Sequence, residues 1–421
     1  MSKIKQIEIY YVSIPLPTIF YPAWIPGFPQ NENRFALIRV LTEDGIEGWS
    51  TGPVIGKEHA TLANLIGPYL IGEDATDIET IQQRIREVSY IGWRNFWIEP
   101  AFWDIKGKVE GKSLCELLGG KPRTVKLYAS TGELKNSTQR IKEVEQRYNE
   151  GFTSIKLKIH HMDEKMDNEQ VQGTAKAMDG KIDLHVDANQ GWRVAMISNA
   201  PLWDLERAKR FSDVCAAAGV KSLEEPLAMD DYDSLCELTK YSKIPVAGGE
   251  LHSYGYPELK MMIERKCYSI FTPDAVFCGG VAQVWNVIQL LKKHNLRFSG
   301  HTWLNGISFA INLQIMAASG YADTEEIEYP YAPPGWTVEA RDQILEEPFY
   351  HKKSTIETPT APGLGFKINK KTLRKYGTRI GIMNQPRLTV HSLRSFGLKV
   401  SLLMDKALKE RKTNTFNSNQ A

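Results

Sequence analysis

Hydrophobic and polar residues alternate strictly between Ser154 and His160. The apolar positions are Ile155, Leu157 and Ile159, and the basic positions are Lys156, Lys158 and His160. Such a period of two predicts a β-strand with one apolar and one basic face. Taken alone, the pattern fits a half-exposed antiparallel strand with solvated lysines. Similar stretches recur downstream, each ending in a carboxylate, histidine or lysine before a helical pattern, and this recurrence favours lysines that lie inside a site.

The first part of the chain predicts an α+β unit, with strands first and helices after. Strand patterns lie at residues 3–13 and in a hairpin over 35–49, and a proline-aromatic loop at residues 15–29 separates them. Helical patterns follow at residues 59–70, 77–88 and 98–118, the last ending at Gly119-Gly120 in the manner of a C-cap.

From residue 125 onward, short strands alternate with helix-length segments, which is typical of a parallel sheet. The strand patterns lie at residues 125–129, 154–159, 182–187, 221–225, 245–250, 269–274, 296–301 and 325–329. Helical segments include residues 137–149, 204–218, 233–241, 256–264 and 281–294. Eight strands without an obvious edge strand favour an α/β closed barrel over an open doubly wound sheet.

After the last strand pattern the chain runs through Pro- and Gly-rich segments at residues 330–335 and 358–365 instead of an ordinary helix. We expect the second segment to pack back on the N-terminal unit. The polar end, residues 406–421, is expected to be frayed or disordered.

Acidic residues end three successive strand patterns: Asp187, Glu224 and Glu250. In a barrel, these ends build the active site. The alternation directs Glu224 into the bore and Glu225 outward. A single acid is often a helix cap or a surface charge, but three at corresponding positions suit a Mg²⁺ ion, which prefers oxygen ligands. Without a metal, the three carboxylates would repel one another.

Across the bore from these acids we expect the two lysines of the second strand to face His301 of the seventh. Two close ammonium groups beside Mg²⁺ would lower a lysine pKa towards neutrality, as a general base requires. Asp274, one strand earlier, is placed to hold the His301 imidazole and set its tautomer. The last strand offers Glu326 and Glu328.

Composition narrows the class of protein. With 52 basic and 50 acidic residues, the net charge of +2 gives no strong field for nucleic acid or an anionic membrane. The five scattered cysteines lack CxxC spacing, which favours reduced thiols over a disulfide framework. No signal peptide or membrane-length apolar run is evident. We therefore expect a soluble cytoplasmic protein with neither a nucleic-acid nor a membrane partner.

In order and spacing, these motifs resemble the mandelate racemase subgroup of the enolase superfamily. The matching residues are Lys156-x-Lys158, Asp187-x-Asn189, Glu224-Glu225-Pro226, Gly249-Glu250, Pro273-Asp274, Gly279-Gly280, His301 and Glu328. Residues 101–120 resemble the last capping-domain helix of the family, and residues 362–365 resemble its C-terminal return. The resemblance covers about residues 3–377, and the part from about Thr378 has no recognised counterpart.

The resemblance implies an α/β fold with a (β/α)7β TIM-like barrel and an N-terminal α+β capping domain. The expected divisions are residues 1–124 for the capping domain, 125–355 for the barrel, 356–385 for a C-terminal segment packing on the capping domain, and 386–421 for an extension of unknown role. Members of the family are usually homo-oligomers, so we expect a homo-oligomer.

The implied metal site is one Mg²⁺ per subunit, held by Asp187, Glu224 and Glu250. Asn189 would contact the substrate or a group around the metal. Glu225 is left open between a place beside the metal ligands and a structural role. The shared reaction of the superfamily removes the proton α to a carboxylate and gives a metal-bound enediolate.

The resemblance also implies catalytic roles. Lys158 would be the base on one face of the α-carbon, with Lys156 lowering the pKa of Lys158 and contacting the substrate carboxylate. His301, oriented by Asp274, would act on the other face. Glu328 would share a proton or hydrogen bond with the enediolate oxygen.

Two reactions are compatible with a lysine and a histidine on opposite faces. In dehydration of an aldonate or aldarate to a 2-keto-3-deoxy acid, Lys158 removes the α-proton and His301 protonates the departing β-hydroxyl. In racemisation or epimerisation of a 2-hydroxy acid, the two groups exchange a proton across the α-carbon. We favour the dehydratase. Other classes are a non-catalytic metal- and ligand-binding barrel and a metal-dependent aldolase or hydrolase, but binding alone needs no such pair and a Schiff-base aldolase needs only one lysine.

The substrate is expected to be a small carboxylate. We assign substrate contacts to Asn189, Trp24 and His252, with His160, His161, Gln190 and Trp303 as further polar residues near the site. The aromatic loop at residues 20–28 is the expected lid that keeps water from the site. The alternative is a proline-rich surface turn packed on its own aromatic side chains.

Overall fold

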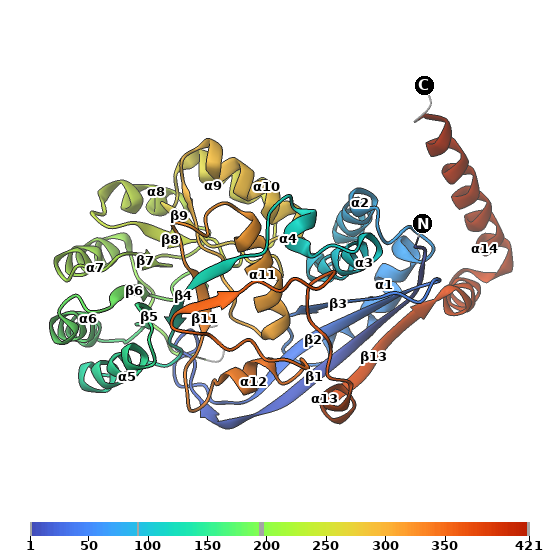
Figure 1. The fold of residues 1–421 in the computed structure, drawn as a ribbon. Coiled ribbons are helices and arrows are strands. Elements are labelled where there is room, and N and C mark those ends of the chain that lie inside the picture. Colours follow the sequence, from blue (N-terminus) through green and yellow to red (C-terminus); the bar gives the residue numbers. More distant parts are fainter. Residues whose placement is uncertain (1, 91, 193–197, 419–421) are drawn as a thin grey trace.

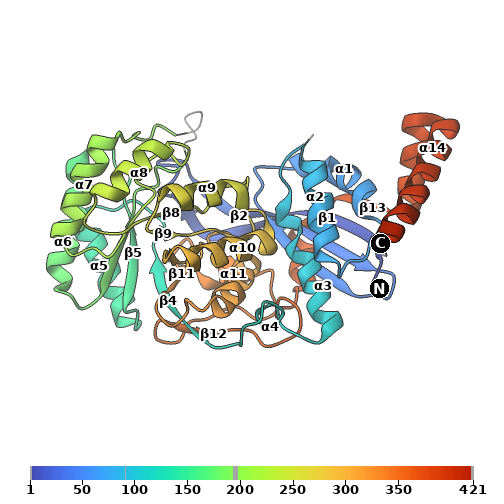
Figure 2. The same ribbon diagram turned by 90° about the horizontal axis from the view of Figure 1, so that it is seen from above.

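A computed structural model describes residues 2–90, 92–192 and 198–418 of the chain. It contains two sheets, a parallel one surrounded by helices and a separate antiparallel one (Figure 1). Seen from above, the antiparallel sheet and its helices lie to one side of the parallel sheet (Figure 2). This is the mixed α/β architecture that the sequence predicts.

The antiparallel sheet has the strand order β13-β1-β2-β3. Its strands are β1 (Ile4–Phe20), β2 (Gln30–Thr42), β3 (Glu47–Gly52) and β13 (Gly377–Asn384). The helices of this domain are α1 (Leu62–Leu70), α2 (Ile78–Ser89), α3 (Pro100–Glu110) and α4 (Leu114–Leu117). Buried side chains of β1 and β2, such as Ile7, Ile9 and Ile38, join the main hydrophobic core. The strands-then-helices unit is therefore present, and it recruits one strand from the far end of the chain.

The predicted loop at residues 15–29 is partly wrong, because β1 continues through Pro15 and Pro17 to Phe20. Proline cannot donate to a sheet ladder and is tolerated where a strand has no partner on that side. Here β13 pairs with β1 only as far as Val12, so both prolines lie beyond it: Pro15 pairs with β2 alone, and Pro17 lies in an irregular stretch of the β1–β2 pairing.

The predicted helix at residues 98–118 is also divided. Helix α3 ends at Glu110 because Gly111 adopts the left-handed conformation (φ 68°), and α4 begins after Ser113. Ser113 and Glu116 form a reciprocal capping box, in which each side chain bonds to the backbone of the other. The glycine and the Ser-x-x-Glu spacing were both readable signals of this break.

The parallel strands follow one another around the barrel in the order β10-β9-β8-β7-β6-β5-β4-β11. They are β4 (Thr124–Ser130), β5 (Ser154–Lys158), β6 (Asp183–Asp187), β7 (Leu223–Glu224), β8 (Val246–Gly248), β9 (Ile270–Phe271), β10 (Arg297–Phe298) and β11 (Ile327–Pro330). The segments around β10 and β11 meet through Ser299 Oγ, which donates to the Glu326 carbonyl at 2.7 Å, and through the Arg297–Glu325 ion pair. The sheet is thereby curled round so that all strand ends face one region.

Helices cover the outside of the curled sheet (Figure 1). They are α5 (Ser137–Asn149), α6 (Glu164–Met178), α7 (Leu205–Ala217), α8 (Tyr232–Tyr241), α9 (Tyr256–Arg265), α10 (Gly280–Lys293) and α11 (Gly306–Ala318). Helix α11 is buried almost all round, as a helix without a polar face must be. It lies against both domains: Asn305 at its N-cap donates to Thr51 Oγ1 at 2.8 Å, and Gln314 accepts from the Cys115 N–H at 2.9 Å.

The chain then returns to the antiparallel domain through α12 (Val338–Asp342), β12 (Thr355–Glu357), which pairs with β4, and α13 (Lys370–Tyr376). In the segment at residues 358–365, the Gly363 carbonyl accepts from the Leu114 N–H and the Leu364 N–H donates to Asp104. These contacts place the segment on the N-terminal helices.

Helix α14 (Gln385–Ser418) ends the described part of the chain. The expectation of a frayed end from residue 406 is wrong as far as residue 418, and residues 419–421 lie outside the described residues. The Lys, Arg and Glu residues that made this end look polar are also good helix formers, as are the Ala and Leu residues between them. Within residues 2–90, 92–192 and 198–418, no helix is both long and apolar enough to cross a membrane.

Candidate active site

Strand register brings the expected acids and lysines together. Lys158 of β5 is the register partner of Asp187 of β6, and Asp187 is the register partner of Glu224 of β7. Since the three strands are parallel and adjacent, these side chains lie in one row across their carboxyl ends. All are buried: Asp187 is 0% exposed, Glu224 3% and Lys158 4%.

Lys156 lies within the acidic cluster. Its Nζ is 2.6 Å from Glu224 Oε2, 2.8 Å from Glu328 Oε1 and 3.7 Å from Asp187 Oδ2. Lys158 makes one such contact, from Nζ to Asp187 Oδ2 at 2.5 Å. The two lysines of the alternating strand therefore point into the barrel, where their charges are balanced by carboxylates, and the solvated-lysine interpretation is wrong.

These contacts set the electrostatics of Lys156. Burial lowers the pKa of the Lys156 ammonium, but the charges of Glu224 and Glu328 outweigh burial and raise this pKa well above its ordinary value. Lys156 is thus a permanent cation that can hold a carboxylate. The expected effect of Lys156 on the pKa of Lys158 stays a prediction.

Glu328 connects two sides of the site. Its Oε1 accepts from Ser130 Oγ at 2.7 Å as well as from Lys156, and its Oε2 accepts from the Thr302 N–H at 3.0 Å. Oε2 also lies 3.7 Å from His301 Nε2. Although burial raises the pKa of Glu328, the charges of Lys156 and His301 lower it overall.

His301 is oriented by Asp274, as expected. Its Nδ1 lies 3.0 Å from Asp274 Oδ2, and its Nε2 lies 3.7 Å from both Glu250 Oε2 and Glu328 Oε2. Burial lowers the pKa of His301, but the charges of Glu250 and Glu328 and the hydrogen bond to Asp274 raise it to about 9.

Asp274 is itself fixed by three donors. Its Oδ1 accepts from Asn312 Nδ2 and from the Val276 N–H, each at 2.8 Å, and Ser308 Oγ lies 3.4 Å from its Oδ2. Ser308 and Asn312 come from the buried helix α11, whose pattern in the sequence was not recognised. A buried helix that carries isolated Ser and Asn residues is the signal that could have found them.

The three proposed metal ligands have the donor chemistry that a hard divalent cation requires, since all supply buried carboxylate oxygens. Among the described residues, Glu224 Oε1 is buried and has no hydrogen-bond partner, so it keeps a free ligand position. Burial raises the pKa of Glu250 to about 7, and the charges of Glu224 and Asp187 act in the same direction, whereas His301 partly offsets them. The residues present fit Mg²⁺.

The acids are nevertheless not arranged as a closed metal cluster. In the part of the chain that the structure describes, no three His, Cys, Asp or Glu side chains form a group that could hold a metal ion. Lysine ammonium groups contact Asp187 and Glu224 in this arrangement. Magnesium binding at these residues stays a prediction.

The expected outward orientation of Glu225 is wrong. The residue has a left-handed backbone (φ 44°), is 2% exposed, and packs against Gly191, where an added Cβ would overlap its carboxylate. Burial, followed by the nearby charges of Glu250 and Asp187, raises the pKa of Glu225 well above its ordinary value. The left-handed turn breaks the strand alternation, so Glu225 and Glu224 both reach the acidic cluster.

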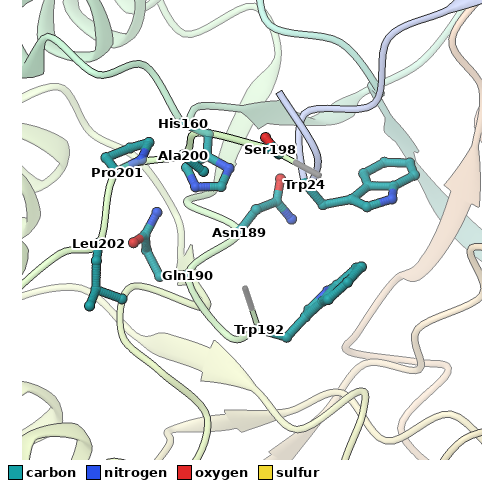
Figure 3. Close-up of a pocket in the computed structure, with 9 residues that line it drawn as sticks. All are labelled: Trp24, His160, Asn189, Gln190, Trp192, Ser198, Ala200, Pro201 and Leu202. Atoms are coloured by element: carbon teal, nitrogen blue, oxygen red, sulfur yellow. The ribbon is translucent and has the colours of Figure 1, made fainter. Parts of the chain in front are cut away.

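A small cavity lies beside the acids. It is lined by Trp24, His160, Asn189, Gln190, Trp192, Ser198, Ala200, Pro201 and Leu202 (Figure 3). Most polar groups here are engaged: His160 Nδ1 donates to the Ala23 carbonyl at 2.8 Å, and Ser198 Oγ donates to the Pro26 carbonyl at 2.8 Å. Asn189 Oδ1 is buried and has no hydrogen-bond partner among the residues that the structure describes, so it is the polar atom best suited to meet a ligand.

Aromatic rings form one wall above Lys158. Lys158 Nζ lies 5.6 Å from the ring centres of both Trp24 and Trp303. Trp303 stacks on Phe20 and Trp336 with centroid distances of 6.2 and 5.6 Å. Phe20 and Trp24 of the predicted aromatic loop therefore belong to a wall that lies beside a lysine of the site, and the role of this loop as a lid stays a prediction.

Other expected or overlooked residues lie around this centre. His252 Nδ1 is 3.0 Å from Glu258 Oε1, and His161 Nδ1 is 2.7 Å from Asp167 Oδ1, so both histidines have acidic partners outside the cavity lining. Tyr128, which sequence reasoning missed, has its ring centre 5.3 Å from Lys156 Nζ. It shares a strand face with Ser130, two residues on, which was the available signal.

Comparison with known proteins fits this geometry. A family model described as "Mandelate racemase / muconate lactonizing enzyme, N-terminal domain" matches residues 8–119, and one described as "Enolase C-terminal domain-like" matches residues 139–372. The chain belongs to the mandelate racemase/muconate lactonizing enzyme family. This family is part of the enolase superfamily. The first matched region lies in the antiparallel domain and the second covers most of the barrel.

Curated relatives of this family member include D-galactarolactone cycloisomerase of Agrobacterium fabrum, which is 27% identical and covers 89% of this chain and 98% of its own. Arabinonate dehydratase of Saccharolobus solfataricus is 24% identical, and the match covers 84% of this chain and 93% of that protein. A solved structure of L-talarate dehydratase from Polaromonas sp. JS666, complexed with Mg and L-glucarate, superposes with a TM-score of 0.74. It is 22% identical, and the match covers 91% of this chain and 100% of that chain. Dehydratases, cycloisomerases and an epimerase thus occur among the relatives, at 21–27% identity, which supports an enzyme.

Proposed function

We propose that the chain is a Mg²⁺-dependent acid-sugar dehydratase that converts an aldonate or aldarate into a 2-keto-3-deoxy acid. The observation that carries the proposal is the His301–Asp274 pair at 3.0 Å on one side of a carboxylate cluster, with Lys156 and Lys158 on the other. The dehydratases among the relatives support the substrate class.

Asp187, Glu224 and Glu250 would hold the metal. When bound, Mg²⁺ supplies positive charge that stabilises the negative charge developing on the substrate carboxylate. Lys156, kept protonated by Glu224 and Glu328, adds a second positive charge at the same carboxylate. Lys158 is held beside Asp187, with its amine below the aromatic wall.

The proposed chemistry needs one base and one acid. Lys158 first releases to solvent the proton through which it pairs with Asp187. Its neutral amine then takes the proton from the α-carbon, and the C–H electron pair becomes the double bond between the α- and β-carbons. The β-carbon–oxygen bond breaks, and the hydroxyl leaves as water after taking the proton of His301 Nε2. The enol product then tautomerises to the 2-keto acid. Asp274 stabilises the imidazolium that must be present at the start.

Racemisation or epimerisation of a 2-hydroxy acid is the second candidate. It is favoured by the same placement of an amine and an imidazole around one carboxylate cluster, and an L-amino acid-D/L-Glu epimerase is among the relatives. In that reaction His301 would return a proton to the α-carbon, and no β-hydroxyl would leave.

The deciding experiment incubates the protein with Mg²⁺ and a panel of aldonates, aldarates, aldarolactones and 2-hydroxy acids in D2O. We expect a 2-keto-3-deoxy product, seen by NMR and by reaction of its carbonyl with semicarbazide, and its loss in Lys158→Ala and His301→Ala. Deuterium at the α-carbon without a keto product would replace the dehydratase by the racemase or epimerase. A panel without product or exchange would contradict both.

A further inference from the structure

The helix that ends the described chain bends sharply. Helix α14 is interrupted at Gly397, whose backbone is not helical (φ 73°, ψ 171°). Before the bend, Leu388 packs against the main core. After it, the helix leaves the antiparallel domain and projects from the molecule in both views (Figures 1 and 2). We call the part from Leu398 to Ser418 the arm.

Apolar side chains are concentrated on this helix. Eight large hydrophobic residues between positions 390 and 404 are exposed: Val390, Leu393, Phe396, Leu398, Val400, Leu402, Leu403 and Met404. Leu398 is 66% exposed and Leu402 60%. Single exposed apolar residues are normal on a protein surface, but eight of them within fifteen positions of one helix mark an interaction site.

The direction of these side chains indicates the kind of partner. At 100° per residue, Leu398 and Leu402 share one side of the arm, whereas Val400, Leu403 and Met404 lie on the other. A helix that rests on a lipid surface has one apolar face and one strongly polar face. A helix that is apolar on several sides is instead enclosed by protein.

The charges of helix α14 indicate which protein surface the arm binds. From Gln385 to Ser418 the chain has seven basic and two acidic residues, which leaves 45 basic and 48 acidic residues in the rest. The end of the chain therefore has a net charge of +5, and the rest of the chain has a slight net charge of −3. Two arms facing each other would repel, whereas an arm facing the body of another copy meets complementary charge.

We propose that the arm binds the body of a second copy of this chain and so holds a homo-oligomer together. Leu402 and Leu403 provide buried apolar contact, and Lys399 and Lys406 provide charge pairing with acidic residues of the partner copy. The bend at Gly397 turns the arm away from its own body, which leaves it free to reach another. The proposal does not depend on the reaction catalysed.

Sedimentation velocity of the full-length chain tests the proposal. We expect the unmodified chain to be oligomeric, and the double variant Leu402→Glu/Leu403→Glu to associate about tenfold more weakly or worse, because charged side chains would enter an apolar contact. Ile55→Glu is the matched control, since Ile55 is an exposed apolar residue of the antiparallel domain at 89% exposure. A monomeric unmodified chain, or a double variant that associates normally, would overturn the proposal.

Cross-linking identifies the contact directly. Equal amounts of unlabelled and ¹⁵N-labelled chain are mixed, treated with an amine- and carboxylate-reactive cross-linker, and digested for mass spectrometry. We expect peptides that join Lys399 or Lys406 of one isotope to the body of the other. Links within one isotope only would overturn the proposal, as would co-flotation of the unmodified chain with anionic phosphatidylglycerol vesicles that the double variant loses, because the partner would then be lipid.

Discussion

Asp274 Oδ2 lies 3.0 Å from His301 Nδ1, and Asn312 and Val276 hold the other oxygen of Asp274 at 2.8 Å. The Asp274 carboxylate is thus held in place by Asn312 and Val276 while it orients the imidazole of His301. The carboxylate of Asp274 accepts a hydrogen bond, so the proton of this bond must lie on His301 Nδ1. Nε2 is then the atom of His301 that exchanges a proton with a substrate.

Asp274→Asn should therefore reduce kcat more than it changes KM. We expect kcat to fall by about 10²–10⁴-fold, the range for a general acid that loses its correct protonation and orientation. The measurement is steady-state kinetics on the substrate identified by the panel, with Asp230→Asn, an exposed carboxylate, as control. An unchanged kcat with a normal thermal midpoint would remove Asp274 from the mechanism.

Metal binding should be visible without any substrate. At Mg²⁺ concentrations about a hundredfold above Kd, the folded state gains about 2.7 kcal/mol, so the thermal midpoint should rise. Glu250→Gln removes one proposed ligand and should diminish the rise, whereas Glu264→Gln, an exposed residue on α9, should not. The proposed metal ligands would be contradicted if the thermal midpoint did not change with Mg²⁺. They would also be contradicted if Glu250→Gln showed the same rise as the unmodified chain.

The buried Glu8 should make the antiparallel domain sensitive to acid. Its carboxylate accepts from Tyr10 and Arg39 of its own sheet and from Arg379 of β13. Burial raises the pKa of Glu8, but the hydrogen bonds from Tyr10 and Arg39 outweigh it and lower the pKa below its ordinary 4.5. The stabilisation is therefore present above pH 4.5 and is lost as the pH falls through the lower pKa of the folded state.

Glu8→Gln should cost about 1 kcal/mol at neutral pH, because the buried carboxylate loses its charge-assisted bonds to Arg39 and Arg379, and solvent screens these bonds at the half-exposed Arg379. The difference in thermal midpoint from the unmodified chain should shrink as the pH falls below 4.5, where the native glutamate also becomes protonated. Glu43→Gln, at an exposed position after β2, is the control. A midpoint difference that is constant with pH would show that charge is not its source.

Close packing of β3 on α3 should make Gly48 intolerant of a side chain. A Cβ at Gly48 would overlap the Ala101 carbonyl oxygen, and Ile105 Cγ1 would lie 2.7 Å away. We expect Gly48→Ala to destabilise the chain by about 1–3 kcal/mol, the usual cost of overpacking. Gly56→Ala, where the nearest atom is Glu58 Oε2 at 3.6 Å, should be nearly neutral when both are compared by thermal unfolding.

The sequence carried enough information for the barrel and for the positions of its acids. Period-two patterns mark the parallel strands, and a residue that ends one of them, such as Asp187 or Glu224, must face the same region as its neighbours. That argument needs only the local pattern and the rule that parallel strand ends meet.

Failures occurred where distant parts of the chain decide the local structure. Pro15 looks like a loop residue until β13 is known to stop short of it, and Glu225 looks outward-facing until its left-handed backbone is known. The pKa of Lys156 likewise depends on distant parts of the chain, because Glu224 and Glu328, whose charges control it, lie on other strands.

The pairing of β13 with β1 has a consequence for synthesis on the ribosome. Residues 6–12 emerge early, but their partners at positions 377–384 are translated only after the whole barrel. Until then one edge of β1 has no neighbour, and an unpaired strand edge is prone to join other chains. Chains in which β13 has not yet been made should therefore aggregate most readily, and they should need chaperones until this strand is available to pair.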